Sequence, residues 1–238
     1  MLLEKLREEN VLETILKGHQ QLIAKASEIL RLILTEEKNN DNDLELIWNQ
    51  IRKGDYETKT SIYKILSDFC WELSQYQIEF LMEKTSKVEQ KAYTIEEIEF
   101  VSKICYSIRH KLSPEETSRI MSIACTIFWR AMCDDSGSNV EVSKKASQKL
   151  SNMFKCNSKL DTKGTPKLVF VEGIVEQACD NIKQNRLVLQ SLKVLKKVLE
   201  HYDTSRVEVM QTLVEKDIVT ALLQNLQDFK NSLKEKWL

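Results

Sequence analysis

Apolar residues recur every three to four positions along almost the whole chain, which is the spacing of one face of an α-helix. The pattern is clear in four stretches, 20–35, 55–73, 115–133 and 185–200. The last stretch is apolar on more than one face, so we expect neighbours on two of its sides. This periodicity predicts an all-α protein.

Helix start signals agree with the periodicity. Ser113 is followed by Pro114 and then by two glutamates, which is the order of an N-cap, a first-turn proline and acids that suit the helix dipole. The segments Ser74–Gln77 and Thr94–Glu97 have the form of capping boxes. Thr165 and Pro166 predict a further start. Both prolines therefore open helices rather than break them.

Polar loops should separate the helices at Lys38–Asn42, Gly54–Asp55, Ser86–Tyr93, Cys133–Asn139 and Lys155–Thr165. We expect about eleven or twelve helices, packed antiparallel wherever the connection is short. The last loop is the longest. It suggests a helical-repeat part over 1–154, a polar loop over 155–165 and a second helical-repeat part over 166–238, unless the whole chain is one continuous solenoid.

A weak internal repeat favours a solenoid. Lys25–Leu30 resembles Lys145–Leu150, 120 positions later. That separation is about three repeats of the armadillo or HEAT class, which are ~40 residues long. We therefore expect an armadillo/HEAT-like α-solenoid of stacked antiparallel helices. The alternative is a compact helical bundle without repeats.

Composition narrows the class further. The 238 residues include 5 Gly and 2 Pro, too few for the many turns of a β-rich chain. The formal net charge is −1, so no overall field attracts nucleic acid or an anionic membrane. No apolar run has the length of a membrane span, and Met1–Glu8 lacks a signal-peptide core. Six cysteines without a C-x-x-C pair suggest a reducing compartment, and we expect the cytoplasm, with the nucleus also open.

Catalytic motifs are missing from the sequence. His19, His110 and His201 each stand near a predicted helix end, where a cation suits the dipole. No Cys/His cluster has zinc spacing, and no P-loop, G-x-G-x-x-G or G-x-S-x-G occurs. Cys133 and Cys156 lie beside loops, so we expect them to be the more exposed cysteines. We predict no enzyme activity for this chain, no cofactor and no metal; the rival hypothesis is a thiol hydrolase using Cys133 or Cys156.

Two charged segments are candidates for binding. The region 144–163 carries six lysines and one acid, and it could dock an acidic partner surface; the lysines are Lys144, Lys145, Lys149, Lys155, Lys159 and Lys163. Only Phe154 supplies an aromatic ring there, so base stacking is missing and nucleic acid is a poor fit. The acidic loop 134–138 carries hydroxyls and could be phosphorylated or bind a cation, although a solvated helix–helix connection explains it as well.

Three tryptophans follow apolar pairs, at Trp48, Trp71 and Trp129, and we expect each to anchor the core. Around them the sequence resembles the helical regions of very large ubiquitin-specific proteases of the fat facets type. The resemblance rests on the segments Ala26–Leu34, Leu44–Trp48, Ile65–Ser74, Gln77–Leu81, Glu172–Ile182 and Leu189–Leu195. It is strongest over 10–82 and moderate over 115–200.

The resemblance implies an armadillo-like region beside a papain-like cysteine protease domain. The family's catalytic Cys and His boxes do not occur in this sequence, so the resemblance carries over no catalytic residue. It implies a non-catalytic scaffold whose partners are other proteins, either substrates in the ubiquitin pathway or the protease domain of the same parent chain. Two alternatives remain, a helical-repeat adaptor unrelated to ubiquitin and a helical repeat that binds nucleic acid or serves nuclear transport.

Overall fold

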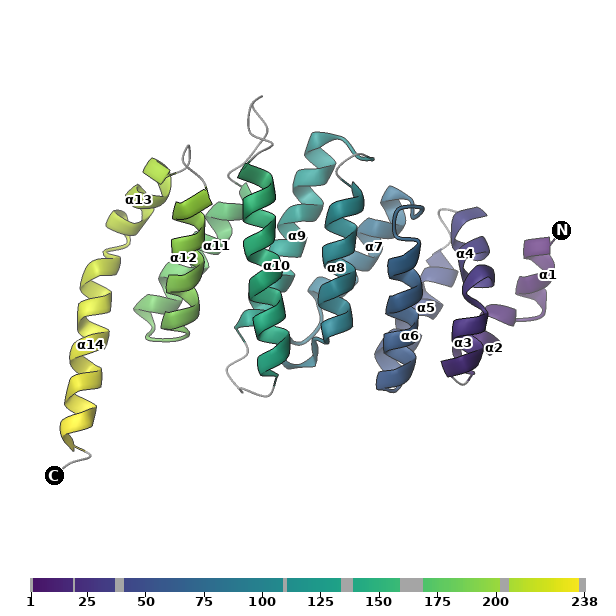
Figure 1. The fold of residues 1–238 in the computed structure, drawn as a ribbon, viewed down its shortest axis with the longest axis horizontal. Coiled ribbons are helices and arrows are strands. Elements are labelled where there is room, and N and C mark those ends of the chain that lie inside the picture. Colours follow the sequence, from purple (N-terminus) through teal and green to yellow (C-terminus); the bar gives the residue numbers. More distant parts are fainter. Residues whose placement is uncertain are drawn as a thin grey trace. The chain divides into compact units, whose positions relative to one another are not determined.

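The computed structural model describes residues 2–18, 20–36, 41–108, 111–133, 139–158, 169–201 and 206–235. In these ranges the chain forms fourteen α-helices and one short 3-10 helix, with no β-strand (Figure 1). The all-α prediction is confirmed. The number of helices is higher than expected because the N-terminal region breaks into short helices. The stretch 20–35, for example, is two helices separated at Ala26.

The chain divides into two compact units, Met1–Ile127 and Phe128–Leu238. The first unit holds α1 Leu2–Glu8, α2 Val11–Leu16, α3 Gln20–Lys25, α4 Ser27–Glu36, α5 Asp41–Lys53, α6 Tyr56–Asp68, α7 Gln75–Ser86, η1 Gln90–Ala92, α8 Ile95–Ser107 and most of α9 Pro114–Met132. The second holds α10 Val140–Ser158, α11 Val169–Lys183, α12 Val188–His201, α13 Arg206–Glu215 and α14 Ile218–Glu235. The residues 155–158 are thus helical, and the rest of the predicted loop lies outside the described residues, so the boundary at 155–165 stays a prediction.

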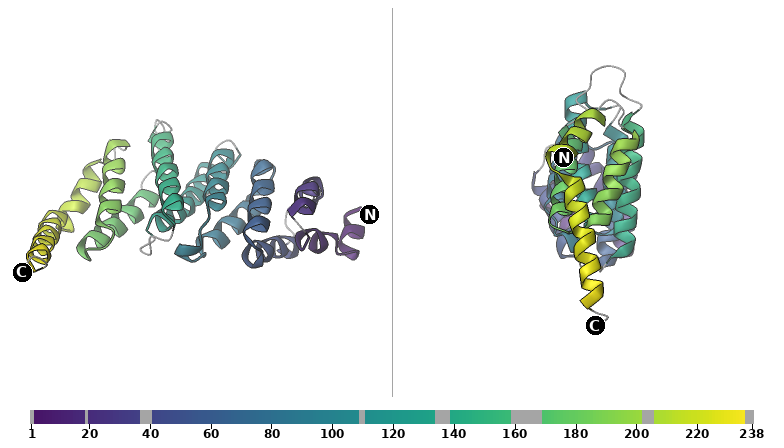
Figure 2. Two further views of the ribbon diagram at one scale, coloured as in Figure 1. Left: turned by 60° about the horizontal axis from the view of Figure 1, so that its bottom comes forward. Right: turned by 90° about the vertical axis from the view of Figure 1, so that its left-hand side faces the viewer.

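The first unit is built from successive helix pairs in two layers. Helices α6 and α8 pack side by side, and α5 and α7 lie behind them in the view of Figure 1. Figure 2 shows α6 and α8 standing next to each other from a second direction. The core between the layers contains fully buried aromatic side chains, among them Tyr63, Tyr93 and Phe100. This stacking of helix pairs is the arrangement of an armadillo-like solenoid.

Polar contacts connect neighbouring helix pairs at a regular spacing along the sequence. The side-chain hydrogen bonds that form this polar ladder join residues 34 to 43 positions apart. Its members are Arg7–Asp43, Leu34–Gln77, Arg31–Glu72, Asp41–Tyr76, Glu45–Lys84, Tyr56–Glu96, Tyr63–Glu97 and Trp71–Lys111 in the first unit, and Asp180–Lys216 and Ile182–Asn225 in the second. The structure therefore has the repeat length of about 40 residues that typifies armadillo and HEAT proteins.

In the second unit, α10 packs beside α12, and α11 contacts α12, α13 and α14. The predicted two-sided burial of 185–200 holds in part: α12 has neighbours in both α10 and α11, but Leu189 and Leu192 stay exposed. The last helix carries an exposed apolar stripe along one side. Its members are Val219, Leu223, Leu226 and Phe229. Among the described helices, none combines the length and the apolar character needed to cross a membrane.

The predicted helix starts are confirmed where the structure describes them. Both capping boxes form, at Ser74 with Gln77 and at Thr94 with Glu97. At the start of α9, the backbone N–H of Ser113 donates to the carboxylate of Glu116 over 2.9 Å, and the hydroxyl of Ser113 accepts from the Glu116 N–H. The predicted start at Thr165–Pro166 lies outside the described residues.

Candidate interaction surfaces

Trp71 is an exposed tryptophan on the first unit. Its side chain is 60% exposed, whereas Trp48 and Trp129 are 8% and 3% exposed. The core prediction was right for those two tryptophans and wrong for Trp71. The reason is that α6 ends at Asp68, earlier than the expected end at residue 73, so Trp71 lies in a turn and does not follow the helical period.

The turn after α6 alternates between the core and the solvent. Phe69, Cys70 and Leu73 are buried, and Trp71 between them faces outward. The backbone N–H of Glu72 donates to the carbonyl of Phe69 over 2.8 Å, which closes the turn. Burial of its neighbours therefore fixes the backbone that presents the indole ring.

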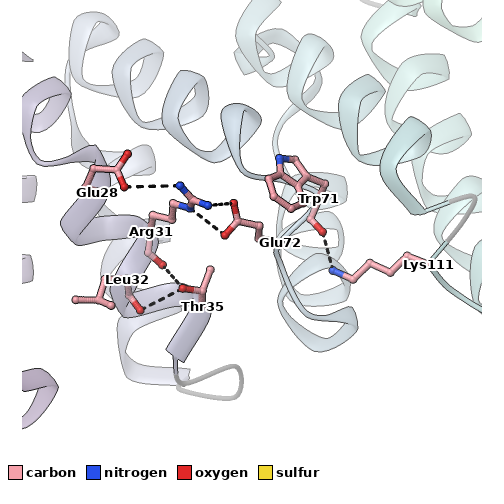
Figure 3. Close-up of polar contacts among 7 residues, drawn as sticks. All are labelled: Glu28, Arg31, Leu32, Thr35, Trp71, Glu72 and Lys111. Atoms are coloured by element: carbon pink, nitrogen blue, oxygen red, sulfur yellow. Dashed lines mark hydrogen bonds and ion pairs between the residues drawn. The ribbon is translucent and has the colours of Figure 1, made fainter.

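Two cations from neighbouring helix pairs hold this turn from opposite sides (Figure 3). Arg31 of α4 binds the Glu72 carboxylate with two nitrogens, Nε at 2.9 Å and Nη2 at 2.6 Å. Lys111 donates to the carbonyl of Trp71 over 3.1 Å and also to the carbonyl of Leu73. A two-point Arg–carboxylate contact constrains both distance and angle. The turn is therefore tied to the preceding and the following helix pair.

An exposed tryptophan on a constrained turn has the properties of a binding hot spot. Trp is enriched among the few residues that carry most of the energy of protein–protein interfaces. A side chain whose backbone is already fixed also loses less entropy when a partner binds. The Trp71 turn, defined as residues 69–73, is therefore our first candidate surface.

A groove of about 470 Å³ lies on the same unit and is lined by Gln21, Ser27, Thr60, Ser61, Lys64, Ile65 and Asp68. Its lining is mostly hydroxyl and amide groups with one cation and one anion. These groups can form hydrogen bonds with a partner. The lining includes no cysteine or histidine that could act as a nucleophile or a general base.

A second groove, of about 230 Å³, runs between α10 and α12 in the other unit. We call it the α10–α12 groove. It is lined by Ser147, Leu150, Ser151 and Phe154 of α10 and by Lys193, Val194, Lys196 and Lys197 of α12. Its charge comes from the three lysines of α12, which were not among the binding residues predicted from sequence.

The lysines predicted from sequence are distributed around α10. At about 100° per residue, Lys144 projects about 60° from Ser147 and so lies beside the groove. Lys145 and Lys149, each two positions from Ser147, project about 160° away from it. The side chain of Lys155 and all of Lys159 and Lys163 lie outside the described residues. A role for these lysines in binding stays a prediction.

The cysteines whose side chains the structure describes are Cys70, Cys105, Cys125, Cys133 and Cys179, and all five are buried, Cys133 at 5% exposure. The expectation that Cys133 is exposed was therefore wrong. Cys133 directly follows α9, and its backbone N–H donates to the carbonyl of Trp129 over 3.1 Å, so the residue continues the helical turn toward the core. Burial also raises the pKa of the Cys70 and Cys179 thiols, and raises that of Cys125 well above its ordinary value. A raised thiol pKa disfavours the reactive thiolate.

Several candidates from the sequence fall on parts that the structure does not describe. These are the side chain of Cys156, the residues His19 and His110, the side chain of His201 and the acidic loop 134–138. Within the described ranges, no three His, Cys, Asp or Glu side chains come together as a metal site would require.

The helix pairs and their 34–43-residue ladder define the class of this protein as an armadillo-like α-solenoid. The profile of the family described as the UBP24/USP9X/USP9Y ARM repeat matches residues 1–236. The chain therefore belongs to this family of ubiquitin-specific protease ARM repeat regions. A search of curated proteins found no match. The family assignment confirms the resemblance noted from sequence, and the matched region is a repeat region rather than a catalytic domain.

Proposed function

We propose that this chain serves as a non-catalytic arm of a large cysteine-type deubiquitinase and recruits partner proteins to it in the cytoplasm. Membership of the ARM repeat family supports the scaffold role. The observation that carries recruitment is the exposed indole of Trp71 on a turn held by Arg31 and Lys111. A solenoid needs only one such patch to bind a partner.

The partners are ubiquitin-pathway substrates or, alternatively, the protease domain of the parent chain. An adaptor unrelated to ubiquitin would use the same kind of surface. It differs in what it binds, because its retained proteins would not be enriched in ubiquitylated species. A thiol hydrolase has less support, since Cys133 is buried.

The test compares proteins retained from a cell extract by the purified chain and by Trp71→Ala, with quantitative mass spectrometry as readout. Tyr106→Ala is the matched control, because Tyr106 is also an exposed aromatic residue of the first unit. We expect Trp71→Ala to lose, by at least about tenfold, a set of proteins enriched in ubiquitin conjugates. Tyr106→Ala should keep that set.

A second pair of variants separates the indole from the turn that holds it. Arg31→Ala removes both contacts to Glu72, and Glu28→Ala removes only the outer contact of Arg31, at 3.7 Å. We expect Arg31→Ala to weaken retention and Glu28→Ala to leave it unchanged. Identical protein sets for the wild type and Trp71→Ala would overturn recruitment through this turn. Labelling of Cys156 by ubiquitin with an electrophilic C-terminus would instead support a hydrolase.

A further inference from the structure

The α10–α12 groove has one charged wall and one neutral wall. Lys193, Lys196 and Lys197 line it from α12, and α10 contributes the hydroxyls of Ser147 and Ser151. No carboxylate belongs to this lining. A ligand in the groove would therefore meet three ammonium groups on one side and hydroxyl donors on the other.

Glu200 pairs with two of the lysines that form the charged wall, with Lys197 over 3.0 Å and with Lys196 over 3.7 Å. These pairs are solvent-exposed, and exposed ion pairs contribute little free energy. A carboxylate from a ligand can therefore replace Glu200 at small cost. Lys193 lies a full turn further from Glu200 and extends the charged wall.

The spacing of the lysines selects a shape of ligand. Lys193 and Lys197 are four positions apart on α12, which corresponds to about 6 Å along the helix axis. An extended peptide advances about 6.6 Å over two residues, and these two side chains point to the same side. Acidic residues at alternate positions of an extended segment would therefore face successive lysines.

The floor of the groove argues against a nucleic acid. Single-stranded nucleic acids bind by stacking their bases on aromatic side chains, in addition to charge. The aromatic residue in the lining is Phe154, and it is fully buried. Carboxylates of a peptide need only the ammonium and hydroxyl groups that the groove provides.

We propose that the α10–α12 groove binds an extended acidic segment of a partner protein, with carboxylates on alternate residues paired to the α12 lysines. The proposal concerns a different surface from the Trp71 turn, so the two can fail separately. The carboxylates approach Lys193 and Lys197, and the hydroxyls of Ser147 and Ser151 donate to the backbone or side chains of the bound segment.

The test is fluorescence anisotropy with the full chain and a labelled peptide that alternates Glu and Ser. Its matched control replaces every Glu by Gln. We expect the acidic peptide to bind, the Gln peptide to show no binding up to about 1 mM, and added salt to weaken the complex. Lys193→Gln with Lys197→Gln should weaken binding by about fivefold or more.

Two further measurements make the result specific. Lys145→Gln with Lys149→Gln removes the same charge from the opposite side of α10 and should leave binding within about twofold. Trp71→Ala should bind the peptide like the wild type, which separates this groove from the recruitment surface. Equal weakening by both lysine pairs would show unspecific charge attraction. Binding of a single-stranded RNA oligonucleotide without peptide binding would likewise overturn the proposal.

Discussion

The hydroxyl of Tyr63 donates a 2.9 Å hydrogen bond to the carboxylate of Glu97, 34 positions later in the chain. Arg52 approaches the same carboxylate oxygen at 3.6 Å, and the ring of Tyr63 packs against Phe100 with 5.4 Å between centroids. Burial raises the pKa of Glu97 and raises that of Tyr63 well above its ordinary value. Two successive helix pairs thus share a buried polar contact, which makes their folding interdependent.

Glu97→Ala should destabilise the chain strongly. It removes the capping partner of Thr94 and leaves the buried hydroxyl of Tyr63 without its acceptor. We expect a loss of about 2–4 kcal/mol in the free energy of unfolding, measured by urea denaturation. The matched control is Glu96→Ala, which removes an exposed hydrogen bond from Tyr56 and one first-turn acid of α8, and should cost less than about 1 kcal/mol. An equal loss in the free energy of unfolding for the two variants would contradict a special role for the buried contact between Tyr63 and Glu97.

Acid sensitivity should depend on Glu79. The hydrogen bond from Arg119 lowers the pKa of this carboxyl below its ordinary value of 4.5. Its stabilising contribution is therefore complete above the ordinary pKa and is lost as the pH falls through the lowered folded-state pKa. Glu79→Gln should be less stable than the wild type at pH 7, by up to about 1 kcal/mol for such a partly exposed pair.

Thermal unfolding between neutral and strongly acidic pH measures this difference. The melting curves of the wild type and Glu79→Gln should converge as the pH drops below the folded-state pKa. Arg119→Gln should likewise reduce the fall in melting temperature at acidic pH. The double variant should melt at nearly the same temperature as either single variant. A difference in melting temperature between the wild type and Glu79→Gln that stays constant across the whole pH range would rule out Glu79 as the titrating group.

Two glycines should respond in opposite ways to alanine. A Cβ on Gly54, in the turn between α5 and α6, would lie 2.6 Å from the carbonyl oxygen of Gln50 and 2.8 Å from Cγ2 of Thr58. Gly54→Ala should therefore destabilise by about 1–3 kcal/mol. A Cβ on Gly173, within α11, meets nothing within 4 Å. Gly173→Ala should stabilise by about 0.5–1 kcal/mol because alanine favours the helix. Calorimetry of both variants checks the two signs.

Cys125 should resist alkylation in the native chain. Its thiol is buried, and burial raises its pKa well above the ordinary 9.0, so little thiolate forms at pH 8. We expect iodoacetamide to modify Cys125 only after urea unfolding, as followed by peptide mass spectrometry. Rapid modification without denaturant would contradict the packing of α9.

The exposed stripe of α14 should tolerate charge. Leu223 and Leu226 are 62% and 64% exposed, so replacing both by lysine should change the free energy of unfolding by less than about 0.5 kcal/mol. It should also reduce the fluorescence of a dye that binds apolar surface. The control is Ile182→Lys, which places a charge in the buried core of α11 and should unfold or strongly destabilise the unit. A large stability loss in the Leu223/Leu226 variant would show that the stripe is covered.

Local signals predicted the helices well. The capping boxes at Ser74 and Thr94 and the start at Ser113 depend on residues three positions apart, so the sequence alone contains them. Trp48 and Trp129 lie within helices, where periodicity predicts burial correctly. Trp71 has the same kind of neighbours, but it follows the end of α6. The turn that presents it is held by Arg31 through Glu72 and by Lys111 through the Trp71 carbonyl, each about 40 residues away, and no local pattern reports such contacts.

The candidate binding sites were harder to predict for the same reason. Lys193, Lys196 and Lys197 have a visible spacing of three and four positions on one helix face. Whether that face borders a groove depends on the position of α10, whose Ser147 is far away in sequence. The predicted lysines of α10 were chosen by their density along the chain, which does not reveal how they are distributed around the helix.

The polar ladder also constrains by how many residues the chain can lengthen or shorten. Each contact, such as Arg31 with Glu72 or Asp180 with Lys216, requires its two residues to be one repeat apart. Losing or duplicating about 40 residues would bring equivalent positions back into register, as in other repeat arrays. Losing ten residues would offset every contact across the junction. The ladder therefore favours evolutionary change in whole repeats, so that such a scaffold can lengthen or shorten while each junction keeps its partners.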